Sequence, residues 1–516
     1  MKVVVRETIA DAGIALLRER GFDVVVDPEA PLDDADALIV RSATKVTAEL
    51  IETAPKLRVI GRAGVGVDNV DVDSATRRGI VVANAPESNV VSAAEHTIGL
   101  LVALARNIPQ AHAALREGRW ERSTWGGVEL ADKTLGVLGF GRIGRQVARR
   151  AIGLQMKVVA YDPFVATERF RELGVERAEF DEVLAQSDFL TLHLPLNDET
   201  RNAIDAGAIA KMRHGVRIVN AARGELLDEG ALIAGLESGK VAGAAIDVYV
   251  KEPYDGPLIQ APNVVLTPHL AASTDEAQDR AGVIVAEQVA AALDGKLVTN
   301  AVNIPTVGAD DLEVLGPFLP LAARLGRLAL QLGGADVKRL EVEVYGGLAE
   351  FDTRLLTVAV LNGAFRGQVD QRVNYVNAPL IAAERGIEVS EAKRTSSRDF
   401  TNLLAVRAGD ARVAGTTIGN EARQWLVSAL GFELEIELSA RMILLRYDDV
   451  PGVIGRVGTL FGAAGVNIAN MTVSRNREGG KALMALSVDS AAPAELLDQL
   501  REGVDDAYVI QLRDED

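Results

Sequence analysis

Short apolar runs alternate with amphipathic stretches along the first part of the chain, and this alternation predicts parallel strands separated by helices. Each run is rich in valine, isoleucine or leucine, which is typical of strands buried on both faces of a sheet. The runs expected to form the first sheet are 3–5, 23–27, 37–43, 57–64 and 81–86. We therefore expect a doubly wound, flavodoxin-like α/β sheet at the start of the chain.

A second alternation of the same kind predicts a second doubly wound sheet, of Rossmann type. Its six expected strands are 134–140, 156–162, 188–195, 217–222, 241–249 and 263–269. Long helices are expected before and after this sheet. Ser92 with Glu95 opens the first helix at capping-box spacing, and Ser273 with Glu276 opens the second. The simplest packing returns the second helix to the first sheet.

The pattern changes near residue 299, where glycine-interrupted helix and strand signals replace the regular alternation. Residues 306–438 fit a mixed α+β region, and no catalytic constellation is visible there. From Arg441 onward the runs follow the order βαββαβ, a ferredoxin-like split unit. The expected domains are 1–91 with 273–304, 92–272, 305–438 and 439–516.

Charge and cysteine content exclude several functional classes. The chain carries 73 acidic against 55 basic side chains, a formal net charge of −18, which disfavours nucleic acid and anionic lipid as partners. It has no cysteine, so disulfides, thiolate metal sites and a cysteine nucleophile are excluded, and no metal is expected. The start shows no signal-peptide pattern, and no apolar stretch is long enough to span a membrane. We expect a soluble, cytoplasmic protein.

A glycine-rich turn follows the first strand of the second sheet. Gly139, Gly141 and Gly144 have G-x-G-x-x-G spacing, and Asp162 lies 23 residues beyond the first of them. Such a turn lets the backbone approach a pyrophosphate at a helix N-terminus, where Arg142 would also touch it. The alternative is a tight turn without a ligand. An acidic Asp162 predicts NAD rather than NADP, because a 2′-phosphate would meet a like charge.

Three polar residues follow successive strands of the second sheet: Arg223, Glu252 and His269. Ligands of doubly wound sheets bind at the carboxyl ends of the strands, where these residues are expected. Hydride transfer from an alcohol needs a base, a carboxylate that orients it and a cation that holds the substrate. The small residues after His269 would leave room for nicotinamide and substrate.

The other four histidines are expected to have less specific roles. His193, at a strand end, fits packing or a wall of the cofactor site. His96, on the long helix, fits a hydrogen-bonded core or interface position near the cleft. His112 and His214 are expected in solvated positions.

Several of these segments together resemble the D-isomer-specific 2-hydroxyacid dehydrogenases. They are GFGRIG, NAARGELLDEGAL, DVYVKEP and TPHLAAST, together with RSATKVT, GRAGVGVDNVD and NAPESN of the first domain. The likeness covers almost the whole chain, with residues 306–438 the part poorest in motifs, and has the form of the long members that act on 3-phosphoglycerate. It implies oxidation of 3-phospho-D-glycerate to 3-phosphohydroxypyruvate, which opens L-serine synthesis.

The resemblance also implies roles for individual residues. Arg223 would bind the substrate carboxylate and C2 oxygen, His269 would be the general base, and Glu252 would orient its imidazole. Val65 stands where the family often has threonine. The implied cofactor contacts are Val65, Gly139, Gly141, Arg142, Ile143, Gly144, Asp162, Leu194, Ala221, Ala222, Arg223, Asp247, His269, Leu270, Ala271 and Ala272.

A phosphorylated substrate needs more than one cation. Arg41 and Arg62 follow strands of the first sheet and can face the cleft, and the backbone N–H groups from Gly64 through Val65 to Gly66 suit a carboxylate. Lys45, and Arg122 reaching from a neighbouring subunit, are further candidates. The alternative for each is an ordinary surface ion pair.

The segment from Arg446 to Arg475 resembles an ACT domain, through its D-x-P-G turn and the later GVNI. The resemblance implies that Tyr447, Asp449 and Asn467 contact L-serine across a two-fold interface, and it favours a homotetramer. The alternative is a dimerisation unit that binds no effector.

Two other functions stay open at this point. One is a related D-2-hydroxyacid dehydrogenase that acts on glycerate, lactate or 2-hydroxyglutarate. The other is an NAD-sensing scaffold that keeps the fold without turnover.

Overall fold

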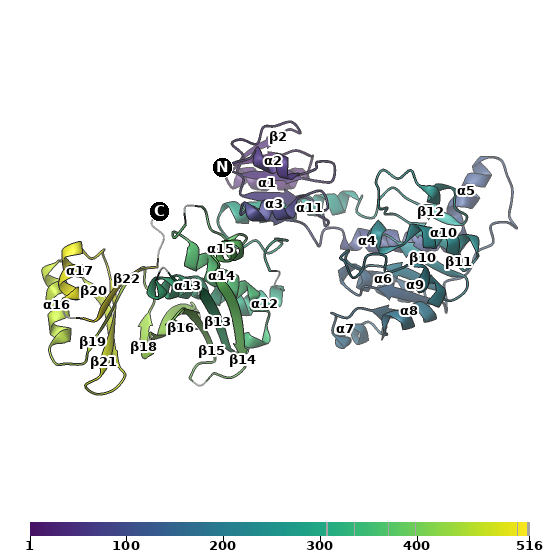
Figure 1. The fold of residues 1–516 in the computed structure, drawn as a ribbon. Coiled ribbons are helices and arrows are strands. Elements are labelled where there is room, and N and C mark those ends of the chain that lie inside the picture. Colours follow the sequence, from purple (N-terminus) through teal and green to yellow (C-terminus); the bar gives the residue numbers. More distant parts are fainter. Residues whose placement is uncertain (306–307, 335, 370, 398, 503, 513–516) are drawn as a thin grey trace.

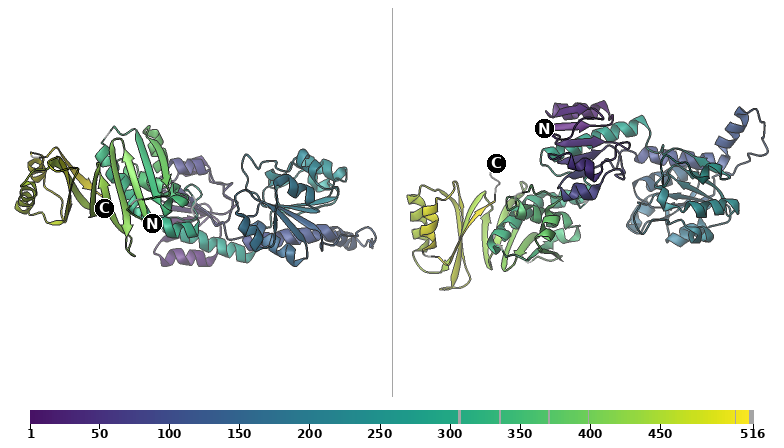
Figure 2. Two further views of the ribbon diagram at one scale, coloured as in Figure 1. Left: turned by 90° about the horizontal axis from the view of Figure 1, so that it is seen from below. Right: turned by 45° about the horizontal axis from the view of Figure 1, so that its top comes forward.

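A computed structural model describes residues 1–305, 308–334, 336–369, 371–397, 399–502 and 504–512. Its strands form four separate sheets, which follow one another along the chain (Figure 1). Two further views show the same elongated arrangement, with the fourth sheet at one end and the second at the other (Figure 2). Residues 306 and 307, at the start of the region expected to be α+β, lie outside the described residues.

The first sheet is parallel throughout and has the order β2-β1-β3-β4-β5, which confirms the flavodoxin-like prediction. The apolar residues of its central strands are buried because helices cover both faces. The strands are β1 (Lys2–Val5), β2 (Asp23–Val26), β3 (Ala37–Val40), β4 (Val59–Arg62) and β5 (Val81–Ala83). The helices between them are α1 (Asp11–Glu19), α2 (Ala48–Glu52) and α3 (Val72–Arg77).

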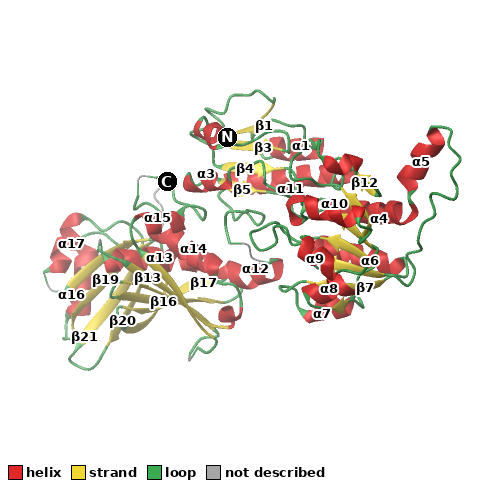
Figure 3. Cartoon of the chain, turned by 45° about the vertical axis from the view of Figure 1, so that its right-hand side comes forward, coloured by secondary structure: helices red, strands yellow, loops and turns green. Residues whose placement is uncertain are grey.

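A later helix, α11 (Asp275–Leu293), packs on this first sheet beside α1 (Figure 3). The backbones of α1 and α11 touch, since a Cβ on Gly13 would lie 2.6 Å from the carbonyl oxygen of Gly282. Its N-cap differs from the expectation. The Oγ1 of Thr274, one residue after Ser273, accepts the N–H of Ala277.

The helix α4 (Val90–Arg106) leads from the first sheet to the second. It begins before Ser92, so the expected capping box is wrong: the Ser92 hydroxyl lies inside the helix and donates to the carbonyl of Asn89. The left-handed Asn107 then ends α4, with φ of 51°, and α5 (Ile108–Arg116) projects from the body (Figure 1).

The second sheet is also parallel and has the order β12-β11-β10-β9-β6-β7-β8. The strand order reverses between β6 and β9, where Rossmann folds bind dinucleotides. The six expected strands are present, together with a short seventh, β8. The strands are β6 (Thr134–Leu138), β7 (Lys157–Tyr161), β8 (Glu176–Arg177), β9 (Phe189–Leu192), β10 (Val216–Asn220), β11 (Val241–Ile246) and β12 (Val264–Leu266). The helices are α6 (Arg142–Gly153), α7 (Thr167–Glu172), α8 (Phe180–Gln186), α9 (Ala206–Lys211) and α10 (Glu229–Glu237).

The third sheet is antiparallel except for one parallel pair, β13 with β14, and has the order β14-β13-β15-β16-β17-β18. This sheet-rich region agrees with the α+β prediction. The strands are β13 (Arg339–Gly346), β14 (Glu388–Arg394), β15 (Asn402–Ala408), β16 (Ala411–Ile418), β17 (Arg423–Ala429) and β18 (Phe432–Glu437). The helices are α12 (Ala309–Leu315), α13 (Leu319–Gly333), α14 (Arg354–Phe365) and α15 (Ala378–Glu384).

The fourth sheet has the order β20-β21-β19-β22 and carries two helices, so the βαββαβ prediction is confirmed. Met442, Leu444 and Leu483 belong to the same hydrophobic cluster as the core of the third sheet. The elements are β19 (Arg441–Asp448), α16 (Val453–Ala463), β20 (Ile468–Arg475), β21 (Lys481–Val488), α17 (Ala494–Arg501) and β22 (Asp506–Gln511).

Within the described ranges, none of the helices combines the length and the apolar character that crossing a membrane would require.

Candidate active site

Three loops meet at the carboxyl ends of β10, β11 and β12. The loop after β10 carries Arg223, and a Cβ on the following Gly224 would overlap the backbone of Tyr249 after β11. The Nδ1 atom of His269, after β12, lies 2.9 Å from Oε2 and 3.0 Å from Oε1 of Glu252, after β11. The glycine thus lets the first two loops touch, and the hydrogen bond joins the second to the third.

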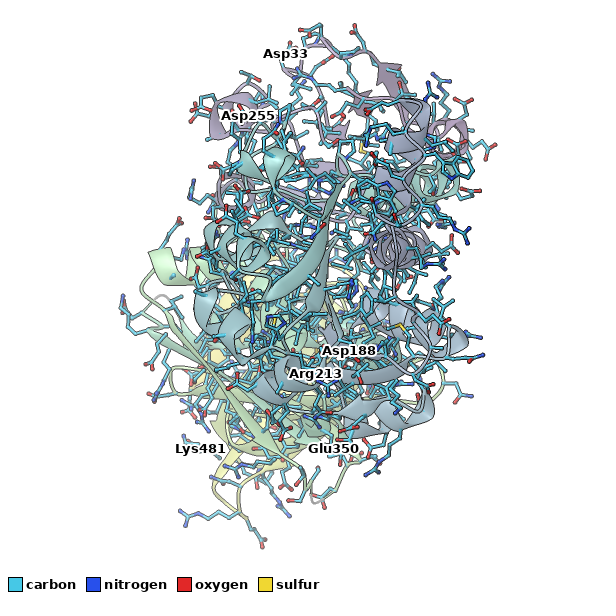
Figure 4. The ribbon with its side chains drawn as sticks, turned by 90° about the vertical axis from the view of Figure 1, so that its right-hand side faces the viewer. Asp33, Asp188, Arg213, Asp255, Glu350 and Lys481 are labelled. Atoms are coloured by element: carbon cyan, nitrogen blue, oxygen red, sulfur yellow. The ribbon has the colours of Figure 1, made fainter. Side chains whose placement is uncertain are left out.

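The opposite end of the second sheet is separate from this group. Figure 4 labels Asp255, from the loop after β11, and the Asp188–Arg213 ion pair, which lies before β9 and β10. The Oδ1 atom of Asp188 is 3.1 Å from Nη1 of Arg213. These two residues are a surface ion pair at the amino ends of the strands.

His269 itself has a left-handed backbone, with φ of 54°, which costs about 1 kcal/mol for a residue with a Cβ. Asp247 stabilises this conformation through three successive N–H groups. Its carbonyl accepts from His269 at 2.8 Å, its Oδ1 from Leu270 at 2.8 Å, and its Oδ2 from Ala271 at 3.0 Å. The loop therefore has its shape fixed by one aspartate.

The Asp247 side chain is fully buried and is surrounded by donors. Oγ1 of Thr267 donates to Oδ1 at 2.5 Å, and Nε2 of His96 lies 3.2 Å from the same oxygen. Burial alone would raise the pKa of Asp247, but the hydrogen bonds from His96, Thr267 and the loop outweigh it and lower the pKa. The carboxylate stays ionised, and its oxygens are directed at protein groups.

A loop of the first sheet lies against Arg223. A Cβ on Gly66 would come 2.5 Å from Nη2 of Arg223 and 2.6 Å from Oδ2 of Asp68. Arg223 and Asp68 form a loose ion pair, with Nη2 and Oδ2 3.6 Å apart. A Cβ on Gly64 would overlap the guanidinium of Arg62. The two glycines thus let cations from both sheets approach one loop.

The first-sheet arginines form a positive group around this loop. Burial lowers the pKa of Arg62, and its Nε has no hydrogen-bond partner among the described residues. The guanidinium of Arg41 contacts the Thr8 carbonyl at 3.3 Å, and its backbone N–H donates to Oε1 of Glu7 at 2.9 Å. Glu7 also accepts two further N–H groups of the same loop. Besides burial, the nearby charges of Arg223 and Arg41 lower the pKa of Arg62, whereas Asp68 and Glu7 raise it.

The two other predicted cations are exposed. Lys45 is exposed in the loop after β3. Arg122 is exposed in the segment after α5, which is attached at the far end of α4 by the hydrogen bond from Val128 N–H to the Ala105 carbonyl. The start of α4 is roughly 25 Å from that end.

The glycine-rich turn fits a dinucleotide. A Cβ on Gly139 would lie 2.5 Å from the His193 carbonyl oxygen, and one on Gly144 would overlap the Gly139 carbonyl. A Cβ on Gly141 would meet no protein atom within 4 Å, so this side of the turn is open to a ligand. The turn opens α6, whose first N–H groups and positive dipole end suit a pyrophosphate.

Asp162 lies directly beside this turn. Its Oδ2 accepts the N–H of Phe140 at 2.9 Å, and its Oδ1 accepts that of Phe164 at 2.9 Å. Nη2 of Arg142 lies 3.1 Å from Oε1 of Glu87 and so joins the turn to the segment before α4. The remaining predicted cofactor contacts lie in the loops at the carboxyl ends of strands or in the first turn of α6: Val65, Ile143, Leu194, Ala221, Ala222, Leu270, Ala271 and Ala272.

Three family models match separate parts of the chain. Residues 98–271 match the D-isomer specific 2-hydroxyacid dehydrogenase, NAD binding domain. Residues 314–427 match the D-3-phosphoglycerate dehydrogenase intervening domain, and residues 441–502 match the ACT domain.

Relatives match almost the full length. The D-3-phosphoglycerate dehydrogenase of Archaeoglobus fulgidus is 44% identical over 530 residues, which cover 99% of this chain and all of that protein. The chain belongs to the D-3-phosphoglycerate dehydrogenase family. The chloroplastic D-3-phosphoglycerate dehydrogenase 2 of Arabidopsis thaliana is 42% identical and covers 97% of this chain and 84% of that protein. As a member, the chain is an NAD-dependent oxidoreductase.

A solved structure with cofactor and ligand is similar to the first two sheets. It is the D-lactate dehydrogenase from Aquifex aeolicus complexed with NAD and lactic acid, which is 28% identical with a TM-score of 0.53. The match covers 59% of this chain and all of the D-lactate dehydrogenase chain. NAD is thus the cofactor of this family member.

The residues predicted to bind an effector lie apart in the ACT domain. Tyr447 is 3% exposed in its core, and burial raises its pKa. The N–H of Asp449 donates to the Gly480 carbonyl at one end of β21, and Asn467 donates to Asp489 at the other. These ends are roughly 30 Å apart, so Asp449 and Asn467 do not meet within one chain.

Sequence reasoning missed Glu7 and Asp68. Glu7 follows β1 at the carboxyl edge of the first sheet, which is the same signal that identified Arg41 and Arg62. Asp68 follows Gly66 in the run GRAGVGVDNVD. Glu7 could have been found from its position after a strand. The contact of Asp68 with Arg223 is visible only in the folded structure.

Proposed function

We propose that the chain oxidises the 2-hydroxyl of 3-phospho-D-glycerate to the ketone of 3-phosphohydroxypyruvate, the first step of L-serine biosynthesis. The observation that carries this proposal is the Glu252–His269 hydrogen bond beside the Arg223 loop. Arg62 lies against the same first-sheet loop as Arg223, and Arg41 is close enough to Arg62 to lower its pKa. The family relatives named for this activity support it.

His269 would act as the general base. The Glu252 carboxylate can only accept, so the hydrogen-bonded Nδ1 carries the proton and Nε2 keeps its lone pair. Nε2 then takes the proton of the substrate hydroxyl. NAD, when bound, accepts the hydride from C2. Gly139, Gly141 and Gly144 would hold its pyrophosphate, and Asp162 its ribose.

The arginines would hold the two anionic groups of the substrate. Arg223, whose guanidinium can contact both oxygens of a carboxylate, would bind the C1 carboxylate and the C2 oxygen. Arg41 and Arg62 would bind the phosphate, and the N–H groups of Gly64 to Gly66 would complete the carboxylate site. The net charge of −18 makes this local positive group necessary for a substrate that carries both a phosphate and a carboxylate.

The test is the double variant Arg41→Ala with Arg62→Ala, compared with an Arg18→Ala control on the exposed face of α1. We expect kcat/KM for 3-phospho-D-glycerate to fall by about 100-fold or more, while unphosphorylated D-glycerate changes much less. An equal loss on both acids would favour another D-2-hydroxyacid as the substrate. A wild-type protein without turnover on any 2-hydroxy acid would favour the NAD-sensing scaffold.

The assembly and the effector are part of the same proposal. We propose a homotetramer in which paired ACT domains bind L-serine through Tyr447, Asp449 and Asn467, with Asp449 and Asn467 from different chains. The opposite positions of these two residues support a shared site. Calorimetry with L-serine tests it. Absence of binding would leave the ACT domain as a dimerisation unit, and binding without a change in turnover would exclude an allosteric role.

We also propose the domain division 1–91 with 273–304, 92–272, 305–438 and 439–516. Four separate sheets and the return of α11 to the first sheet support it. Limited proteolysis with mass spectrometry tests the boundaries, because cleavage concentrates in exposed linkers. The cytoplasmic location stays a prediction.

A further inference from the structure

The proposed reaction does not use His96. Its imidazole nevertheless contacts Asp247, the residue that binds the backbone of the loop carrying His269. His96 belongs to α4, and its imidazole contacts Asp247 and Thr267 at the ends of β11 and β12. We propose that His96 is a positioning residue for hydride transfer: it donates to Asp247, which in turn fixes the loop that carries His269. This inference rests on the proposed function and adds a residue to it.

The contact has a defined direction. Nε2 of His96 lies 3.2 Å from Oδ1 of Asp247 and 3.2 Å from Oγ1 of Thr267. Since the hydroxyl of Thr267 is already directed at Asp247, at 2.5 Å, both neighbours of the imidazole are arranged around one carboxylate. An ionised carboxylate can only accept, so the hydrogen of His96 is on Nε2. His96 is thus the side-chain N–H donor to a fully buried anion.

A buried carboxylate needs all its donors to stay in place. Asp247 has the Thr267 hydroxyl and two loop N–H groups besides His96. If His96 is lost, the carboxylate has to move toward its remaining partners or admit water. Either change reaches the N–H groups of Leu270 and Ala271, and with them the left-handed backbone of His269. The orientation of the catalytic imidazole therefore depends on a residue that does not touch it.

The position of His96 in the fold adds a second consequence. It lies in the second turn of α4, which begins at Val90, directly after the chain leaves the first sheet. Asp247 and Thr267 follow strands of the second sheet. A movement of the start of α4, such as a closing of the two sheets on the substrate, would reach His269 through this contact.

Two substitutions distinguish the hydrogen bond that His96 donates from the packing of its side chain. His96→Leu keeps an apolar volume but removes the donor, and His96→Gln keeps an N–H donor. The full-length protein is assayed with NAD and 3-phospho-D-glycerate, unlabelled and deuterated at C2, and its thermal midpoint is measured. His214→Leu is the control, because His214 is exposed on the opposite side of the sheet, before β10.

We expect His96→Leu to lower kcat by about tenfold, because small misplacements of a reacting group slow the chemical step. The KM values for NAD and substrate should change little, the isotope effect on kcat should rise, and His96→Gln should recover most of the rate. A lower thermal midpoint with an unchanged kcat would overturn the proposal in favour of packing. So would a His96→Gln variant as slow as His96→Leu.

A failure of the proposed function gives a different result. If the wild-type protein prefers another 2-hydroxy acid, the same variants are compared on that acid. If it turns over none, carbethoxylation of His269 by diethyl pyrocarbonate, followed by mass spectrometry, reports the loop directly, because the ring is 47% exposed. The rate of His269 carbethoxylation should differ several-fold between His96→Leu and His214→Leu. Equal rates in the two variants would overturn the proposal.

Discussion

Nδ1 of His269 forms a hydrogen bond with Oε2 of Glu252 at 2.9 Å, although the two residues are 17 positions apart in the chain. The second oxygen lies almost as close, at 3.0 Å. The two oxygens share one N–H group, which favours the tautomer with its hydrogen on Nδ1 and leaves Nε2 able to accept a proton.

Replacing Glu252 by glutamine should remove that control. The amide can present its NH₂ group to Nδ1 and so favour the wrong tautomer, and it no longer stabilises the imidazolium formed during the reaction. We expect kcat to fall by about 10²- to 10⁴-fold with little change in the KM for NAD, measured by NADH absorbance. Glu237→Gln, an exposed residue at the end of α10, is the matched control. A Glu252→Gln variant within twofold of the wild type would contradict the assignment.

The two later glycines of the turn should respond differently to alanine. A Cβ on Gly141 meets no protein atom, so Gly141→Ala should fold with an unchanged thermal midpoint but bind NAD about tenfold more weakly. A Cβ on Gly144 overlaps the Gly139 carbonyl, so Gly144→Ala should lose both stability and NAD binding. Fluorescence titration with NAD and thermal unfolding measure the two effects. Normal NAD binding by Gly141→Ala would show that the pyrophosphate does not approach there.

Asp162 should determine the preference for NAD over NADP. Asp162→Ala removes the acceptor for the ribose hydroxyls and the charge that repels a 2′-phosphate, and it frees the N–H of Phe140. We expect kcat/KM with NAD to fall about tenfold and the ratio of NAD to NADP activity to narrow. The comparison needs both cofactors at saturating substrate. An unchanged ratio would exclude Asp162 as the ribose ligand.

His193 should make stability depend on pH. Burial lowers its pKa from 6.5 to about 4, so between these values the unfolded chain binds more protons than the folded one. Stability is fully present above pH 6.5 and falls as the pH is lowered toward 4, by up to about 1.4 kcal/mol per unit. His193→Asn should lack this component. Thermal midpoints between pH 7 and 5 measure it, and parallel curves for the two proteins would contradict it.

Local patterns were sufficient for much of the fold. Runs such as 37–43 and 134–140 predicted strands correctly, because burial on both faces leaves a continuous apolar signature. β8 was missed because it is two residues long and reads Glu176–Arg177. The helix caps predicted at Ser92 and Ser273 were wrong. Several polar residues near the start of a helix can satisfy the same spacing, and the direction in which the chain enters the helix decides which of them is the cap.

The sequence likewise predicts some features of the candidate site and not others. The positions of Arg223, Glu252 and His269 at the carboxyl ends of strands could be predicted, because parallel strands bring such residues to one edge, while their catalytic roles stay predictions. Neither the role of Asp247 in the loop nor its contact with His96 could be read from spacing. These contacts depend on how α4 crosses the sheet, which periodicity does not record.

The close approach of Gly13 to Gly282 has a consequence for how the protein is made. During synthesis the strands of the first sheet leave the ribosome early, but Gly61 and its neighbours stay uncovered until Val285 and Val289 of α11 have been translated. The intervening segment, which has its own sheet, can fold in that interval. The amino-terminal unit is therefore completed after the one that follows it, and a nascent chain stopped before α11 would expose an apolar face that chaperones bind.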